Sequence, residues 1–139
     1  MKLQKFSRPL VKVLGADDPF AERIRTASEW YFESLCADNE TFKLIQMTTA
    51  IEALLGEGKE QVTERLADRC SFLLAKNQKE RNAIRDDFLE IYDMRSNVIH
   101  TGRVMLSDEE HPYLDKLKKI LEDAIKKEID QHSNIAIEK

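Results

Sequence analysis

An arginine and a histidine stand out in the predicted helix over residues 78–100, because both occupy positions where chemistry is possible. Arg95 interrupts an apolar stripe that otherwise recurs at helical spacing, and His100 follows at the end of the same helix. A buried guanidinium is very costly unless it meets a carboxylate, a partner subunit or a ligand. The chemistry open to Arg95 is therefore ion pairing or the binding of a ligand.

The spacing of the two side chains limits how they can share a site. Five residues turn an ideal helix by about 500°, so Arg95 and His100 point about 140° apart. They share one face only if the helix unwinds near Thr101 and Gly102, or if a second copy of the chain completes the site. This geometry favours a composite, dimeric arrangement.

Two more charged residues lie where the helical pattern predicts apolar side chains. Glu52 lies in the stripe of the predicted second helix, and Arg69 lies seven residues after Val62 in the third. Glu52 is the obvious carboxylate to meet Arg95 inside the fold. Such a pair could simply fix the register of two helices, and a histidine at a helix end could simply favour the helix dipole.

The composition and periodicity of the chain predict an all-α fold. The 139 residues are 42% hydrophobic and 35% charged, which suits one globular domain. Only four glycines and three prolines are present, whereas an all-β protein needs a turn about every 8–12 residues. Apolar residues recur instead at spacings of three and four. The prediction is an antiparallel bundle of four to five helices with short connections.

Capping signals place the boundaries of these helices. Asp18 before Pro19 predicts a helix start, and so do Asn39 (or its neighbour Asp38) and Asn77. The predicted helices cover about residues 19–37, 39–55, 59–75 and 78–100, and a last helix begins about a turn after residue 107. We divide the chain into a basic lead-in or linker (1–16), a helical domain (17–130) and a fraying polar tail (131–139).

Charge, cysteines and hydropathy exclude several classes of function. The formal net charge of −4 disfavours nucleic-acid binding that is driven by overall charge, so an RNA contact needs a local basic site. Cys36 and Cys70 lack a Cys or His partner at metal-ligand spacing, and we expect two reduced, buried thiols. No apolar run could span a membrane, and the first residues lack the core of a secretory signal. We expect a soluble cytoplasmic protein that needs no cofactor and no metal.

The segment of residues 91–102 resembles the signature of HEPN domains, specifically the Apea-like group. That superfamily is marked by an arginine followed a few residues later by a histidine, late in a helix of an antiparallel bundle. Here four residues separate Arg95 from His100, and Asp93 with its neighbour Tyr92 also fits the pattern. The residues around Glu52 and around Arg69 resemble the group's second and third helices. The resemblance covers roughly residues 20–125.

The resemblance implies a metal-independent endoribonuclease that dimerises, so that two such motifs line one cleft, in a defence or stress-response role. The ribose 2′-OH would attack the adjacent phosphate and leave a cyclic phosphate. His100 would act as general base or acid, and Arg95 would hold the phosphate and stabilise the transition state. Glu52 would orient Arg95, and Ser96, with Asn97 beside it, could contact the phosphate.

Two other classes of function stay open. The chain could be a non-catalytic dimerising module that binds RNA, nucleotide or a protein partner. It could also be an antitoxin-like or sensory partner in which the Arg–His pair is structural. An enzyme needs Arg95 and His100 exposed to a shared cleft, whereas a structural role needs Arg95 buried against Glu52.

Overall fold

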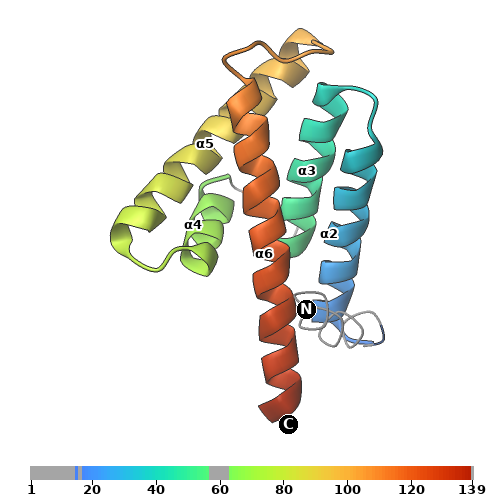
Figure 1. Cartoon of the computed structure of the whole chain (residues 1–139), viewed down its shortest axis with the longest axis vertical. Coiled ribbons are helices and arrows are strands. Elements are labelled where there is room, and N and C mark those ends of the chain that lie inside the picture. The colour runs from blue at the N-terminus through green and yellow to red at the C-terminus, as the bar shows by residue number, and fades with distance from the viewer. Residues whose placement is uncertain (1–14, 16, 57–62, 139) are drawn as a thin grey trace, which may run out of the picture.

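The computed structural model describes residues 15, 17–56 and 63–138, and within them it contains five helices and no strand. In chain order these helices are α2 (Pro19–Cys36), α3 (Glu40–Leu55), α4 (Thr63–Leu74), α5 (Gln78–Thr101) and α6 (His111–Glu138). Helices α2 and α3 run in opposite directions, as do α5 and α6 (Figure 1). The predicted all-helical bundle is confirmed for the described part of the chain.

The predicted helix boundaries are confirmed by cap geometry at four places. Asp18, Asn39 and Asn77 each accept a hydrogen bond from the backbone N–H three residues on, at 2.8–2.9 Å. These bonds satisfy N–H groups that lack an intrahelical partner. Gly102 ends α5 at φ 64°, in the left-handed region that a side chain would strain.

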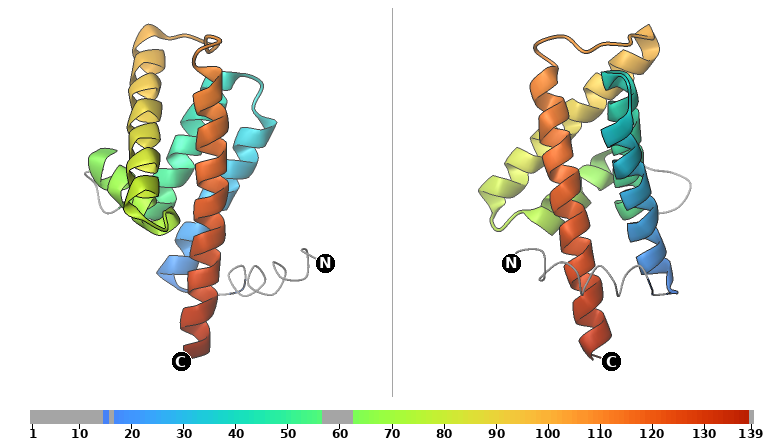
Figure 2. Two further views of the ribbon diagram at one scale, coloured as in Figure 1. Left: turned by 60° about the vertical axis from the view of Figure 1, so that its left-hand side comes forward. Right: turned by 45° about the vertical axis from the view of Figure 1, so that its right-hand side comes forward.

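Helix α6 holds the fold together because it contacts all four other helices. Helices α2 and α3 pack along each other as one pair, and α4 and α5 form a second pair. Figure 2 shows α6 lying across both pairs, so that residues at the end of the chain close the interior. The bundle therefore has one apolar core that runs along the length of α6.

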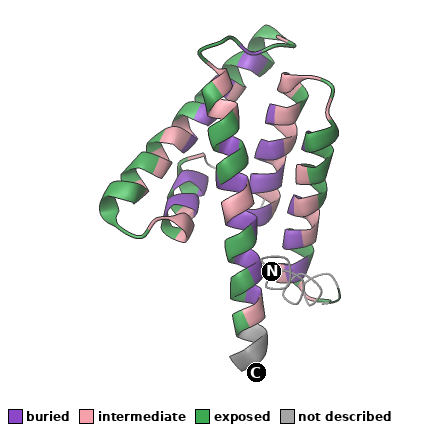
Figure 3. Cartoon of the chain, viewed as in Figure 1, coloured by how far each residue is buried: buried purple, intermediate pink, exposed green. Residues whose placement is uncertain are grey.

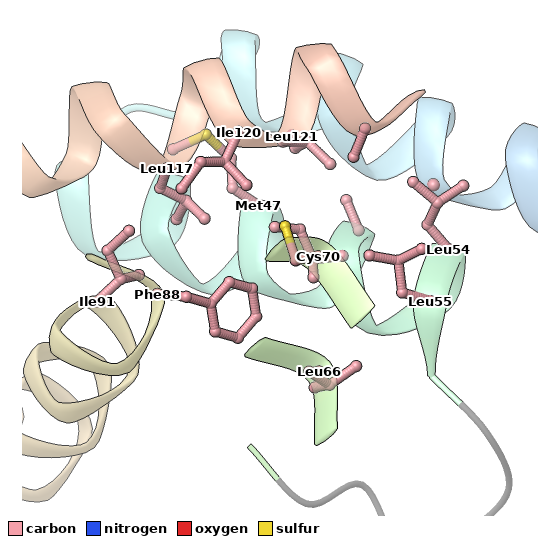
Figure 4. Close-up of a cluster of buried hydrophobic side chains, with 14 of the residues drawn as sticks. Met47, Leu54, Leu55, Leu66, Cys70, Phe88, Ile91, Leu117, Ile120 and Leu121 are labelled. Carbon is pink, nitrogen blue, oxygen red and sulfur yellow. The ribbon is translucent and has the colours of Figure 1, made fainter. Parts of the chain in front are cut away.

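Buried residues line the inward sides of the helices, and the outward sides are exposed (Figure 3). The largest fully buried side chain is Phe88 of α5, which lies among residues of α3, α4 and α6 (Figure 4). Leu117 and Leu121 of α6 are also fully buried, and so is Cys70 of α4. Burial raises the pKa of the Cys70 thiol to about 12, so this cysteine is an apolar core residue, as predicted.

Four expectations differ from the structure or lie outside it. Cys36 is exposed at the end of α2 rather than buried. Helix α6 continues through Glu138 instead of fraying at Gln131, because His132 is buried and lies 2.9 Å from the carboxylate of Asp18. The predicted lead-in, apart from residue 15, and the predicted start of the third helix near residue 59 lie outside the described residues.

Among the described helices, none is both long enough and apolar enough to cross a membrane.

Candidate functional site

Arg95 is fixed by a hydroxyl group of the neighbouring helix α3. Its Nε donates a hydrogen bond to Thr48 Oγ1 at 2.9 Å. Thr48 is fully buried, and its hydroxyl lies 3.0 Å from the carbonyl oxygens of both Leu44 and Ile45. The hydroxyl donates its one proton to the helix backbone and offers a lone pair to Arg95. Helix α3 therefore orients the inner edge of the guanidinium without neutralising its charge.

The predicted direct pair between Glu52 and Arg95 is absent from the described residues, because a tyrosine lies between them. The Tyr92 hydroxyl donates to Glu52 Oε1 at 3.2 Å, and the Arg95 guanidinium carbon lies 6.0 Å from the centre of the Tyr92 ring. The ring also stacks on Phe88 at 4.9 Å. Burial, with Glu52 beside it, raises the pKa of the Tyr92 phenol above its usual range, and Arg95 opposes that rise.

The outer edge of the Arg95 guanidinium has no partner among the described residues. Its only hydrogen bond within them uses Nε, which leaves both Nη groups unbonded, and no carboxylate there pairs with it. The side chain is half-buried, so it is reachable from solvent while its inner edge is held. Two parallel N–H donors of this kind are suited to a phosphate or carboxylate group.

His100 lies on a different face of α5. The helix continues regularly through Thr101 and ends at Gly102, so it does not unwind to bring His100 towards Arg95. The imidazole is exposed, and no hydrogen bond or ion pair joins it to any other described residue. One copy of the chain therefore presents the two side chains about 140° apart, as the spacing predicted.

The other predicted site residues do not gather around Arg95. Asp93, Ser96 and Asn97 are all exposed on the outer face of α5. Arg69 belongs to another part of the bundle, where its Nη1 donates to the carbonyl oxygen of Leu55 at 2.6 Å. This hydrogen bond joins α4 to the end of α3. Arg69 therefore has a structural role at a position where the helical pattern predicts an apolar residue.

The sequence reasoning missed Thr48 as the residue that holds Arg95. The spacing of Thr48 and Thr49 places both on the apolar face of α3, where a threonine hydroxyl can be satisfied by the backbone carbonyls of the preceding turn. Both hydroxyls do make such contacts, but Thr48 alone also meets Arg95. The sequence did hold a signal for this contact. Thr48 places a hydroxyl on the apolar face of α3, and Arg95 is a charged residue in the apolar stripe of a neighbouring helix.

An apolar groove, also missed, continues from Arg95 towards the end of α5. Ile99 follows Arg95 by one helical turn, and Ile45 precedes Thr48 by one turn on α3. Ile45 and Ile99, together with Phe42 and Val104, line a cavity of about 290 Å³, and Arg95 and Thr48 lie one helical turn outside its lining. Phe42 is 56% exposed and Val104 is 61% exposed, so this groove is an apolar patch open to solvent.

The segment that follows α5 is held against the start of α3. Arg103 donates two hydrogen bonds to the Glu110 carboxylate, at 2.7 and 2.8 Å, and this contact lowers the pKa of Glu110 to about 2. The Thr41 hydroxyl donates to the carbonyl oxygen of Arg103 at 2.8 Å, and Glu40 accepts from the backbone of Leu106 at 2.9 Å. The rim of the groove is therefore fixed to the bundle.

The described residues contain no group of three or more His, Cys, Asp or Glu side chains that could hold a metal ion. Comparisons of the chain with protein-family models, with curated proteins and with solved structures found no match.

Proposed function

We propose that this chain is a HEPN-type domain that cleaves RNA without a metal ion, in a site that two copies of the chain complete. The observation that carries the proposal is the environment of Arg95. The neutral hydroxyl of Thr48 holds the guanidinium, and none of the described carboxylates forms an ion pair with it. An arginine with this arrangement is oriented for an external anion, such as the phosphate of an RNA chain.

In the proposed reaction Arg95 binds the scissile phosphate through its two Nη groups. His100 of the second copy removes the proton from the ribose 2′-OH, and the 2′ oxygen attacks phosphorus. The bond from phosphorus to the 5′ oxygen breaks, and the proton passes from His100 to that oxygen. The products are a 2′,3′-cyclic phosphate and a free 5′-OH, and Arg95 stabilises the charge of the transition state.

A second copy is needed because one helix presents Arg95 and His100 on different faces. The apolar groove beside Arg95 supplies a surface on which that copy can pack, since Phe42, Ile99 and Val104 are exposed there. Met105, which follows in the chain, is 72% exposed. Exposed apolar side chains gathered in one patch are typical of protein–protein contacts.

The resemblance to HEPN domains supports the biological setting of the proposal. We infer a role in defence or stress response, in the cytoplasm, with a protein partner or antitoxin to restrain the activity. Ser96 and Asn97 are exposed on the outer face of α5 and are the next candidates to contact the RNA backbone.

The direct test is cleavage of mixed RNA by the purified chain in EDTA, beside Arg95→Ala and His100→Ala variants. Lys79→Ala, a substitution of an exposed residue in the first turn of α5, is the matched control. Cleavage by the parent and the control, with cyclic phosphate ends, supports the proposal. Equal cleavage by all four proteins, or none by the parent, overturns it.

Mixing the two inactive variants tests whether the site is composite. Random pairing makes about half of the dimers mixed, and each mixed dimer carries one complete site of two. About a quarter of the parent activity should therefore return on mixing. If Arg95 and His100 act within one copy, mixing restores nothing.

The second candidate is a module that binds RNA without cleaving it. The separation of Arg95 and His100 within one copy of the chain favours this alternative. Under this alternative Arg95→Ala weakens RNA binding, His100→Ala does not, and no cyclic phosphate is formed.

A further inference from the structure

A second cavity lies at the other end of α3 from the Arg95 groove. It measures about 580 Å³ and is lined by residues of four helices, among them Phe20, Arg23, Leu54, Phe72, Leu73 and Glu128. Its volume falls within the range of small-molecule sites, which are mostly apolar with a few converging polar groups. Because Phe42 and Leu54 are twelve residues apart on α3, the two cavities are separated by roughly 18 Å along that helix.

Glu128 is the unusual residue of this cavity. Its side chain is only 7% exposed, yet it forms no hydrogen bond or ion pair within the described residues. The other carboxylate in the wall, Asp68, is already paired, because Arg85 Nε donates a hydrogen bond to it at 2.8 Å. Burial raises the pKa of Glu128, and the charge of Arg23 opposes that rise. The Glu128 oxygens are not among the fully buried atoms without a partner, so they are open to the cavity, where a cation could pair with the carboxylate.

Arg23 supplies the opposite charge at the same cavity. It is exposed, its guanidinium carbon lies 5.5 Å from the centre of the Phe20 ring, and none of the described carboxylates forms an ion pair with it. It lies close enough to Glu128 to act on that group electrostatically. Arg69 also lines the cavity, where its Nη1 donates to the carbonyl oxygen of Leu55. Beside these engaged groups, the cavity offers the carboxylate of Glu128 and the guanidinium of Arg23 near each other, above an apolar wall.

That wall is made by leucine side chains and an aromatic ring. Leu54 belongs to the buried core and Leu73 packs against that core partly buried, while Phe72 is 67% exposed, with the Arg81 guanidinium 4.9 Å from its centre. An apolar group of a ligand would cover this exposed surface. The negative group of Glu128, the positive group of Arg23 and the apolar wall together suit a zwitterionic ligand with an apolar body.

We propose that the cavity binds a free α-amino acid with a bulky apolar side chain. The ammonium group contacts Glu128, the carboxylate contacts Arg23, and the side chain lies against Leu54, Leu73 and Phe72. Each charged contact replaces an unpaired group with a charge-assisted hydrogen bond. This site is separate from Arg95, so it stands whether or not the chain cleaves RNA.

Titration calorimetry with L-leucine, L-phenylalanine and L-tryptophan tests the proposal on the full chain. At least one of them should bind, and its N-acetyl and amide derivatives, which lack one charge each, should bind about tenfold or more weakly. Absence of heat with all three amino acids, or equal binding by the two derivatives, overturns the proposal. These arms use the unaltered chain and need no variant to fold.

Two substitutions then place the ligand in the cavity. Glu128→Gln and Arg23→Gln should each weaken binding about tenfold or more. Asp115→Asn, the same change at an exposed position of α6, should leave binding unchanged. Glu128→Gln removes an unpaired buried charge, so its melting temperature should not fall. If both cavity variants bind as the parent does, the ligand lies elsewhere and the assignment fails.

Discussion

Thr48 Oγ1 accepts a hydrogen bond from Arg95 Nε at 2.9 Å, and this contact joins α3 to α5 beside the predicted motif. Its importance is that the partner is neutral. A carboxylate at the same place would orient the guanidinium equally well but would compete with any anionic ligand. Because a hydroxyl holds it, Arg95 has no neighbouring carboxylate at this contact to compete with an anionic ligand.

Replacing Thr48 by valine should weaken RNA binding by the chain. Valine has nearly the shape of threonine but leaves Nε of Arg95 without its acceptor, so the guanidinium loses its fixed orientation. The free energy of unfolding should fall by about 1 kcal/mol, as for the loss of one hydrogen bond. Urea denaturation and RNA titration by fluorescence anisotropy measure the two effects. Thr49→Val, which removes only a hydroxyl contact to the backbone at 2.7 Å, is the matched control and should leave RNA affinity unchanged.

Glu52→Gln should have little effect on RNA affinity. The carboxylate accepts from the Tyr92 hydroxyl at 3.2 Å and does not touch Arg95, and the glutamine keeps an oxygen that can accept this bond. We expect less than a threefold change in affinity, measured beside Thr48→Val in the same RNA titration. A larger loss with Glu52→Gln than with Thr48→Val would show that the carboxylate positions Arg95 after all.

Much of the fold could be predicted because local sequence signals determine it. Asp18, Asn39 and Asn77 are residues whose side chains accept from the backbone at a helix start, and Gly102 is the residue that fits a left-handed helix end. The end of α6 could not be predicted in this way. It is held by His132 against Asp18, a contact between residues 114 positions apart that leaves no periodic trace in the chain.

The site was less predictable than the fold because it depends on contacts across helices. Arg95 stood out as a charge in an apolar stripe, but three nearby side chains could have met it. Spacing alone favoured Glu52, whereas packing inserts the ring of Tyr92 and brings Thr48 into contact. The azimuth of His100, by contrast, followed from helix geometry alone, since α5 stays regular to Thr101.

Phe88→Ala should be strongly destabilising. The ring is fully buried among residues of three other helices, and its removal leaves a cavity in the core that α6 closes (Figure 4). The expected loss in the free energy of unfolding is about 3–5 kcal/mol. Phe72→Ala is the matched control, because that ring is 67% exposed and its loss should cost about 0.5 kcal/mol or less. Similar midpoints of urea denaturation for the two variants would contradict this account of the core.

The Arg103–Glu110 pair should make the stability of the chain depend on pH in the acid range. Arg103 lowers the pKa of Glu110 from an ordinary value of 4.5 to about 2. Below the ordinary value the unfolded chain therefore binds a proton at Glu110 that the folded chain does not, and folding becomes less favourable as the pH falls. The contribution of the pair is fully present above pH 4.5 and disappears as the pH approaches 2.

Comparison with Glu110→Gln isolates this effect, because the glutamine cannot titrate. The parent should be more stable than the variant near neutral pH, by at most about 1 kcal/mol because the two side chains are partly exposed. Urea denaturation at a series of pH values should show this difference shrinking below pH 4.5. A difference that stays constant down to pH 2 would mean that the ion pair does not stabilise the fold, and that other contacts, such as those of its backbone with Glu40 and Thr41, hold the segment after α5.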